Sequence, residues 1–233
     1  MLAIFKREFK SYFCTPVGYI VLAALYFFLG LYFSMSYSYG SPNLEVVVVS
    51  MSTIVIFVMP VITMRLMSED RRQKGDQALL TAPVSLTSVV LGKFFAAFAL
   101  FACGFIPTVI FELIILSFVS VNVLSYLYAL LGILLLGSAL IAIGMFISSL
   151  TESSVVSAVV TLIVNILVLY MSNFASMVNV EWIATIFEKL AFISVFESFA
   201  ESIFSISNII YFLSIIAAFL FLCVRSLEKR RWS

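Results

Sequence analysis

Long apolar stretches separated by short charged segments dominate the pattern of residues along this chain. Each stretch is close to the roughly 20 residues that a transmembrane helix needs. We expect six spans, near residues 17–39, 44–64, 90–118, 126–149, 154–176 and 207–225. The third stretch is longer than a bilayer requires and contains Pro107, which predicts a kink or a tilt. The pattern therefore predicts an all-α membrane protein with one transmembrane domain over residues 1–233.

Residues 2–14 have the pattern of an amphipathic helix that lies along a membrane surface. On a helix, the apolar and basic positions of this segment fall on different faces. The apolar face holds Leu2, Phe5, Phe9, Tyr12 and Phe13, and the basic positions are Lys6, Arg7 and Lys10. This separation indicates an interfacial elbow helix before the first span. The first span is long enough to cross the bilayer and has no small-residue cleavage pattern, so we expect it to be retained.

The longest polar segment, residues 65–93, carries much of the charge of the chain. We expect a helix that bends near Gly75, followed by a small apolar patch at Leu79 and Leu80. Pro83 should end this segment before the next span begins around Ser85. A solvated loop that merely joins two spans is the alternative. Against that alternative, a loop would leave both leucine side chains in water, which is unfavourable.

A second interrupted segment, residues 177–206, is too polar for a clean span and very apolar for a loop. Its apolar positions are punctuated by Glu181, Glu188, Glu197 and Glu201. Two short re-entrant helices between spans five and six, entering the outer leaflet, would account for both properties. Trp182 would then suit the aromatic belt of the outer interface. Each half of the segment is too short for a further crossing.

The composition of the chain indicates that lipid is its solvent. The 233 residues are 64% hydrophobic and 11% charged, with a mean hydropathy of +1.20. Ordinary soluble domains are about 45–50% apolar and about 25% charged. A chain of this length has too small an interior to keep so much apolar surface away from water. We therefore expect a multi-pass membrane protein.

Basic residues are distributed unevenly between the two sides that six spans would create. Those on one side are Lys6, Arg7, Lys10, Arg65, Arg71, Arg72, Lys74, Lys93, Arg225, Lys229, Arg230 and Arg231. Only Lys189 falls in a segment assigned to the other side. The positive-inside rule then places both termini and the 65–93 segment in the cytoplasm.

Motifs that would support chemistry within this chain are missing from the sequence. The chain has no histidine and three widely spaced cysteines, which argues against imidazole catalysis, a disulfide framework and a metal cluster. It contains neither a Gly-rich phosphate loop nor another catalytic motif. We therefore expect no enzyme activity and no cofactor bound by this chain. The net charge of +1 gives no reason to expect a nucleic-acid partner.

Four polar residues inside the expected spans or at their ends are candidates for a transport pathway: Glu112, Asn165, Tyr170 and Asn173. Acids inside a membrane are functional candidates by default, although Glu112 is near enough to the outer end of its span to reach the interface. Asn165 and Asn173 lie roughly on one helix face, where hydrogen bonding to a neighbouring helix is the alternative role. In the fourth stretch, Gly137 and Gly144 predict close helix packing.

Several stretches, taken in order, carry a resemblance to a known family: FKREFKSYFCTPVGYI at 5–20, EDRRQKGDQALLTAPVSLTSVVLGKF at 69–94, ISVFESFAESIFSISNIIYFLS at 193–214 and LEKRRW at 227–232. Over essentially its whole length the chain resembles the membrane subunit of type-2 ABC exporters, especially the gliding-motility and nitrous-oxide-reductase-maturation type permeases. In relatives a glycine or a basic residue often follows the FESFA-like stretch, whereas Glu201 and Ser202 stand there in this chain. That departure weakens any inference about a shared substrate or external partner.

The resemblance implies a permease of the bacterial cytoplasmic (inner) membrane that moves a substrate out of the cytoplasm or the inner leaflet. Two permeases, identical or related, would pair, and each would sit on a cytoplasmic ABC ATPase that binds ATP and Mg. Residues 69–83 would supply the coupling helix. From the amphipathic character of this segment we infer polar contacts by Glu69, Arg71, Arg72, Lys74 and Gln77, and anchoring by Leu79, Leu80 and Pro83. Membrane lipid and an extracytoplasmic accessory protein on the 177–206 segment are further candidate partners.

Three other kinds of protein compete with this interpretation. A secondary transporter or channel that works alone often shows buried ion-handling residues and internal repeats, which are not evident here. A membrane assembly or anchoring subunit would have no transport path, and the absence of any ATPase partner would favour it. An intramembrane enzyme is disfavoured by the missing histidine and the lack of paired acids.

Overall fold

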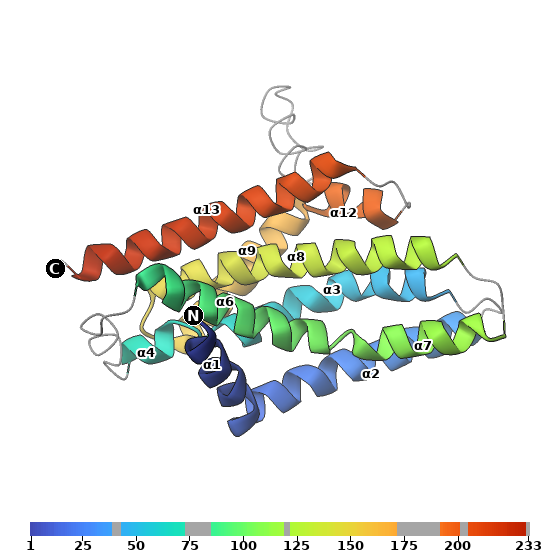
Figure 1. Ribbon diagram of the computed structural model, residues 1–233, viewed down its shortest axis with the longest axis horizontal. Coiled ribbons are helices and arrows are strands. Elements are labelled where there is room, and N and C mark those ends of the chain that lie inside the picture. The colour runs from blue at the N-terminus through green and yellow to red at the C-terminus, as the bar shows by residue number, and fades with distance from the viewer. Residues whose placement is uncertain (39–42, 73–84, 119–121, 172–191, 201–204, 232–233) are drawn as a thin grey trace.

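A computed structural model describes residues 1–38, 43–72, 85–118, 122–171, 192–200 and 205–231. All regular structure within these residues is helical, which confirms the predicted all-α class. The helices are α1 (Leu2–Cys14), α2 (Pro16–Ser38), α3 (Leu44–Thr63), α4 (Ser68–Arg72), α6 (Leu86–Cys103), α7 (Ile106–Leu116), α8 (Val123–Leu150), α9 (Ser154–Leu169), α12 (Phe192–Ala200) and α13 (Ile206–Arg231). The long helices run side by side along the longest axis, whereas α1 lies across one end (Figure 1).

Five helical segments of the described chain are long and apolar enough to cross a membrane. They are α2, α3, the α6–α7 pair taken together over Leu86–Leu116, α8, and α13 over Ile206–Lys229. α9 is apolar but has 16 residues, fewer than a span needs. The last part of the predicted fifth span, residues 172–176, lies outside the described residues. That span and the six-span topology therefore stay predictions.

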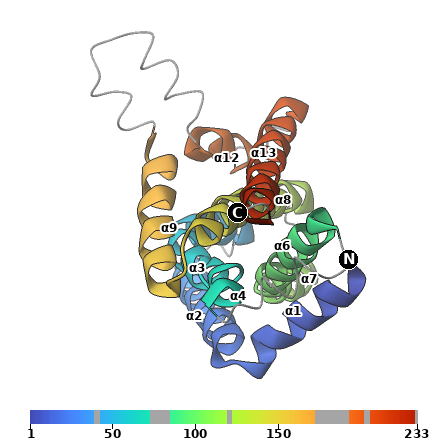
Figure 2. The same cartoon turned by 90° about the vertical axis from the view of Figure 1, so that its left-hand side faces the viewer.

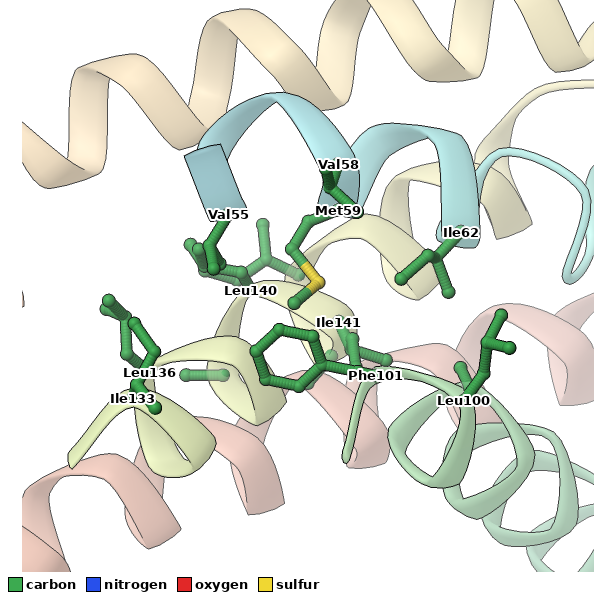
Figure 3. Close-up of a cluster of buried hydrophobic side chains, with 14 of the residues drawn as sticks. Val55, Val58, Met59, Ile62, Leu100, Phe101, Ile133, Leu136, Leu140 and Ile141 are labelled. Carbon is green, nitrogen blue, oxygen red and sulfur yellow. The ribbon is translucent and has the colours of Figure 1, made fainter. Parts of the chain in front are cut away.

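α8 is the central helix of the bundle, with α3, α6, α9, α12 and α13 packed against it (Figures 1 and 2). Figure 3 shows where side chains of α3, α6 and α8 meet in the core: Val55, Val58, Met59, Ile62, Leu100, Phe101, Ile133, Leu136, Leu140 and Ile141. Neighbouring helices approach α8 closely where it carries glycine. A Cβ atom at Gly137 would overlap the Phe101 ring, and one at Gly144 would overlap Thr63. The close packing predicted for the fourth stretch is therefore confirmed.

The third span is broken, as the position of Pro107 predicts. α6 ends at Cys103 and α7 begins at Ile106, with Pro107 in the first turn of α7. Proline is tolerated in a first turn because its missing N–H would have no helical partner there. The start of the span differs from the expected residue 90. α6 already begins at Leu86, after Ser85 caps it by accepting a hydrogen bond from the Ser88 N–H.

Helix α1 covers the residues predicted for the elbow helix. Lys6, Arg7 and Lys10 are exposed, whereas Tyr12 is buried and Phe9 packs against the core. Leu2, the first residue of α1 and assigned to the apolar face, is instead 74% exposed. α1 packs against α6 and α2. The placement of α1 in a membrane interface stays a prediction.

Helix α12 is the described part of the predicted re-entrant segment over residues 177–206. It packs against α8, where Gly132 leaves room for Phe196 and Phe199. Residues 177–191 and 201–204 lie outside the described residues, and Trp182 is among them. The re-entrant arrangement therefore also stays a prediction.

Candidate coupling site at one end of the bundle

The chain turns sharply between α3 and α4. α3 ends at Thr63, residues 64–67 form turns, and α4 follows from Ser68. We name residues 62–72 the α3–α4 corner. The corner lies at the end of the bundle where α1 and the beginning of α6 are also found (Figure 1). The predicted coupling segment continues beyond it into residues 73–84, which lie outside the described residues, so the corner is the described base of that segment.

The C-terminal end of α8 binds the corner through one hydroxyl group. The backbone N–H groups of Met67 and Ser68 donate to Ser148 Oγ at 3.2 and 3.1 Å. The same hydroxyl donates to the Met64 carbonyl at 3.3 Å. N–H groups at the start of a helix have no partner within it, and Ser148 supplies that partner for α4. Because Ser148 lies more than 75 residues away in sequence, the corner is tied directly to the central helix.

A buried lysine binds the corner from the α6 side. Lys93 is 1% exposed, and its Nζ donates to the Leu66 carbonyl at 2.6 Å. The same Nζ lies 3.4 Å from Glu8 Oε1 on α1, and Glu8 also pairs with Arg7 at 2.6 Å. A buried ammonium group needs such partners because its transfer out of water is costly. Lys93 therefore joins α1, α6 and the corner at one point.

A tyrosine of α1 makes a second connection to the corner. Tyr12 is buried, and its hydroxyl donates to the Ile62 carbonyl at 3.0 Å. Burial raises the pKa of the Tyr12 phenol above its usual value of 10.0, and the Glu8 carboxylate adds to this effect. The phenol therefore stays protonated and remains a hydrogen-bond donor at neutral pH. Together with Lys93, it fixes the elbow helix against the end of α3.

Two arginines order the charged part of the corner. Arg65 donates from Nε and Nη2 to the two carboxylate oxygens of Glu69, at 2.7 Å each. The Glu69 hydrogen bond raises the pKa of Arg65 further above its usual range, so the guanidinium is charged at any physiological pH. Arg71 reaches the turn between α8 and α9, where Nη1 donates to the Leu150 carbonyl at 2.7 Å and Nε lies 3.3 Å from Glu152 Oε1. α4 is thereby linked to the end of α8 and to the turn before α9.

The structure describes part of the predicted coupling set. Glu69 and Arg71 lie in α4 and make the contacts above, and the backbone of Arg72 ends that helix. The other members, Lys74, Gln77, Leu79, Leu80 and Pro83, lie outside the described residues. The predicted elbow residues Phe5, Lys6, Arg7, Phe9 and Lys10 all lie on α1, with Phe5 stacked on Phe9 at 5.8 Å between ring centroids.

Four residues that connect the corner to other helices were not singled out from the sequence for that role: Glu8, Tyr12, Lys93 and Ser148. Lys93 was assigned to a polar cytoplasmic segment, and the structure corrects this assignment. Because α6 begins at Leu86, Lys93 lies inside this helix, and neighbouring helices bury its side chain. A sequence signal for Lys93 does exist. It is a single charge with apolar residues on both sides, in a stretch with good helical periodicity.

The candidate pathway residues are not brought together. Glu112 on α7 is 5% exposed, and Asn165 on α9 is fully buried, yet α7 and α9 stand on different sides of the bundle (Figure 2). The predicted hydrogen bond from Asn165 to another helix is not seen, since neither amide atom has a partner within the described residues. Asn165 instead shares one buried face of α9 with Ser157 and Thr161. Tyr170 caps the end of α9, and Asn173 lies outside the described residues.

Replacing Ser148 with alanine tests the link between α8 and the corner. We expect the free energy of unfolding to fall by about 1–3 kcal/mol, because two backbone N–H groups and one carbonyl lose a partner. The midpoint of unfolding in an SDS titration, followed by circular dichroism, measures this change. Ser138→Ala is the matched control, since its hydroxyl bonds the Leu135 carbonyl of its own helix and no other helix within the described part of the chain. Equal losses for the two variants would contradict the assigned link.

Comparison with known proteins identifies the class of the chain. A family model described as ABC-2 family transporter protein matches residues 9–168, which is more than half of the 233 residues. No curated protein matches the chain. The match and the membrane-length helices together show a multi-pass membrane protein that is a membrane component of an ABC transporter. The chain thus belongs to the ABC-2 transporter family.

Proposed function

We propose that this chain is the permease subunit of an ABC exporter. In this role it couples ATP hydrolysis by a separate ATPase to movement of a substrate out of the cytoplasm or the inner leaflet. ATP and Mg are bound by the ATPase, and this chain performs no catalysis. The family match supports the transporter class, and the positive-inside distribution of basic residues supports a cytoplasmic location for both termini.

The observation that carries the proposal is the way the α3–α4 corner is held. Lys93 and Tyr12 bind it to α6 and α1, while Ser148 and Arg71 bind it to the end of α8 and the turn before α9. A segment that merely connects two spans would not need buried contacts to so many helices. These contacts would instead allow the corner to transmit a movement of the segment that follows it, residues 73–83, to the helices of the bundle.

The coupling mechanism follows from this joint. The 69–83 segment binds a groove of the ATPase, with Glu69, Arg71, Arg72, Lys74 and Gln77 in polar contacts and Leu79, Leu80 and Pro83 as anchors. Closure of the ATPase pair moves the segment. The corner transmits this movement to α8 and to the elbow helix, so that the transporter changes between inward-facing and outward-facing states.

The assembly that this function requires has two permeases and two ATPases in the bacterial cytoplasmic membrane. The second permease is either a copy of this chain or a related one. An extracytoplasmic accessory protein would bind at residues 177–206, on the side opposite the ATPase. Membrane lipid surrounds the exposed apolar faces of helices such as α9 and α13.

The double substitution Leu79→Asp/Leu80→Asp tests the proposal. We expect this variant to bind its ATPase about 100-fold or more weakly than wild type, since unpaired carboxylates buried in an interface cost several kcal/mol. The measurement is copurification of the chain with a candidate ABC ATPase, followed by ATP hydrolysis by the complex. Stimulated hydrolysis should disappear together with the association.

The matched control places two new carboxylates at the opposite end of the bundle, as Tyr37→Asp/Phe118→Asp. Both side chains are exposed there, and the control should keep the ATPase bound. If the wild-type chain retains no ATPase, the permease proposal fails, and a membrane assembly subunit or an independent channel becomes the function to test. If both double variants bind the ATPase normally, the coupling segment lies elsewhere.

A further inference from the structure

Two cavities follow one another along the seam between α2 and α3, which pack side by side (Figures 1 and 2). The first, of about 420 Å³, lies at the corner end and is lined by Val17, Met64, Arg65, Glu69 and Glu152, among others. We name it the mouth. The second, of about 270 Å³, begins one helical turn further along both helices and is named the α2–α3 groove. On α2, Val17 of the mouth precedes Val21 of the groove by one turn. At the end of α3, Val61 of the groove precedes Arg65 of the mouth by one turn, so the two cavities follow each other along the same pair of helices.

The α2–α3 groove is apolar throughout. Its lining includes Ile20, Ala24 and Phe28 of α2 and Ile54, Val58 and Val61 of α3. Ile20 and Phe57 are more than half exposed, so the groove opens to the outside of the bundle, where both helices are of membrane-spanning length. The solvent on that side is hydrocarbon, and a flexible hydrocarbon chain is the ligand that such a groove suits.

The length of the seam matches one leaflet of a bilayer. From Val17 in the mouth to Phe28 at the far end of the groove, α2 rises about 16 Å at 1.5 Å per residue. The hydrocarbon core of a bilayer is about 30 Å thick, so one leaflet contributes about half of it. A ligand with its polar end in the mouth and its tail in the groove would therefore stay within a single leaflet.

The mouth carries charges of both signs. Arg65 uses two of its five N–H groups on Glu69, which leaves the guanidinium able to bind a phosphate as well. Glu152 is 70% exposed and lines the mouth from the turn between α8 and α9, where its Oε1 lies 3.3 Å from Arg71 Nε. Its carboxylate accepts hydrogen bonds, and an ammonium group is the donor that complements it best. The mouth thus pairs a phosphate-binding cation with ammonium-binding carboxylates.

We propose that the mouth and the α2–α3 groove bind one phospholipid with a phosphoethanolamine head group. The phosphate lies at Arg65, the primary ammonium lies at Glu152 and Glu69, and one acyl chain fills the groove. Anionic phospholipids match the mouth less well. Their head groups carry no ammonium, so a neutral or negative group would lie beside the two carboxylates. The lipid comes from the leaflet on the same side of the membrane as α4. In the orientation of the proposed function, this is the cytoplasmic leaflet.

A direct binding experiment tests the head-group part. The chain is purified in detergent, and binding of phosphatidylethanolamine and phosphatidylglycerol with identical acyl chains is measured by native mass spectrometry. We expect the ethanolamine lipid to bind at least tenfold more tightly. Arg65→Gln should weaken binding of both lipids about tenfold, whereas Glu152→Gln should weaken binding of phosphatidylethanolamine and reduce the preference for it. Equal affinities of the wild-type chain for the two lipids would overturn the proposal.

Adjacent alanines of α2 supply a matched pair for the groove. Ala24 lines the groove, whereas Ala23 is exposed and is not part of the groove's lining. We expect Ala24→Trp to lower the affinity for phosphatidylethanolamine at least tenfold, and Ala23→Trp to change it less than twofold. Equal binding by both variants, each confirmed as folded by its circular dichroism, would also overturn the proposal. No ATPase is present in either experiment, so failure here is separate from failure of the proposed function.

Discussion

Substitution of Lys93 by leucine is expected to lower the free energy of unfolding by about 3–5 kcal/mol. Lys93 is 1% exposed and bridges the Leu66 carbonyl and the Glu8 carboxylate, so leucine leaves a buried carbonyl unpaired and removes a positive charge from Glu8. The Leu66 carbonyl then stays buried without its charged donor, which costs more than an exposed hydrogen bond would, whereas Glu8 keeps its pair with Arg7. The SDS-unfolding midpoint of the purified chain measures the loss.

Lys10→Leu is the matched control for that prediction. Lys10 is exposed on α1, and its replacement should change the free energy of unfolding by no more than about 0.5 kcal/mol. The combination Glu8→Gln/Lys93→Leu should lose less than the sum of the single variants, because the two residues interact directly. Similar losses for Lys93→Leu and Lys10→Leu would show that the buried junction contributes nothing specific.

Introducing a leucine side chain at Gly137 is expected to destabilise the bundle by about 3 kcal/mol or more. Even a Cβ atom there would overlap the Phe101 ring, which is fully buried and rests against Phe105 with ring centroids 5.1 Å apart. Because the ring is buried between the two helices, we expect the added side chain to push α6 and α8 apart. The same SDS titration provides the measurement, and a loss of packing should also broaden the transition.

Gly30 on α2 provides the control for the substitution at Gly137. A Cβ atom at Gly30 would have no neighbouring atom within 4 Å. Gly30→Leu should therefore be neutral or slightly stabilising, by up to about 1 kcal/mol, because leucine favours a helix more than glycine does. Equal unfolding free energies for Gly137→Leu and Gly30→Leu would contradict the close approach of α6 to α8.

Much of the architecture is predictable from residue order because each helix is governed by local rules. The bounds of α1 follow from its amphipathic pattern, and the break between α6 and α7 follows from Pro107. Length and hydropathy were sufficient for α2, α3 and α8. The start of α6 shows how two local signals can differ. The apolar stretch alone placed it near residue 90, which is too late, whereas Pro83 placed it around Ser85, the residue that caps the helix.

The contacts of the candidate site, in contrast, could not be predicted from residue order. Lys93 and Ser148 appear unremarkable in the sequence, since their partners Leu66 and Met67 lie 27 and 81 residues away. The same holds for the mouth, where Arg65 and Glu152 are joined by no sequence motif. Asn165 was predicted to bond a neighbouring helix, and it is buried as expected but has no partner within the described residues. Burial follows from a residue's helix face, whereas a hydrogen-bond partner depends on which helices pack together.

Residue order is enough to predict the helical class, the membrane as solvent and the family resemblance, because hydropathy, helical periodicity and charge bias are local or additive properties. The packed helices were needed to show that α8 is the central helix and that the α3–α4 corner is bound by α1, α6 and α8. They were also needed to show that a charged mouth continues into an apolar groove. These features arise from contacts between residues far apart in the chain, and their geometry depends on how all the helices pack at once.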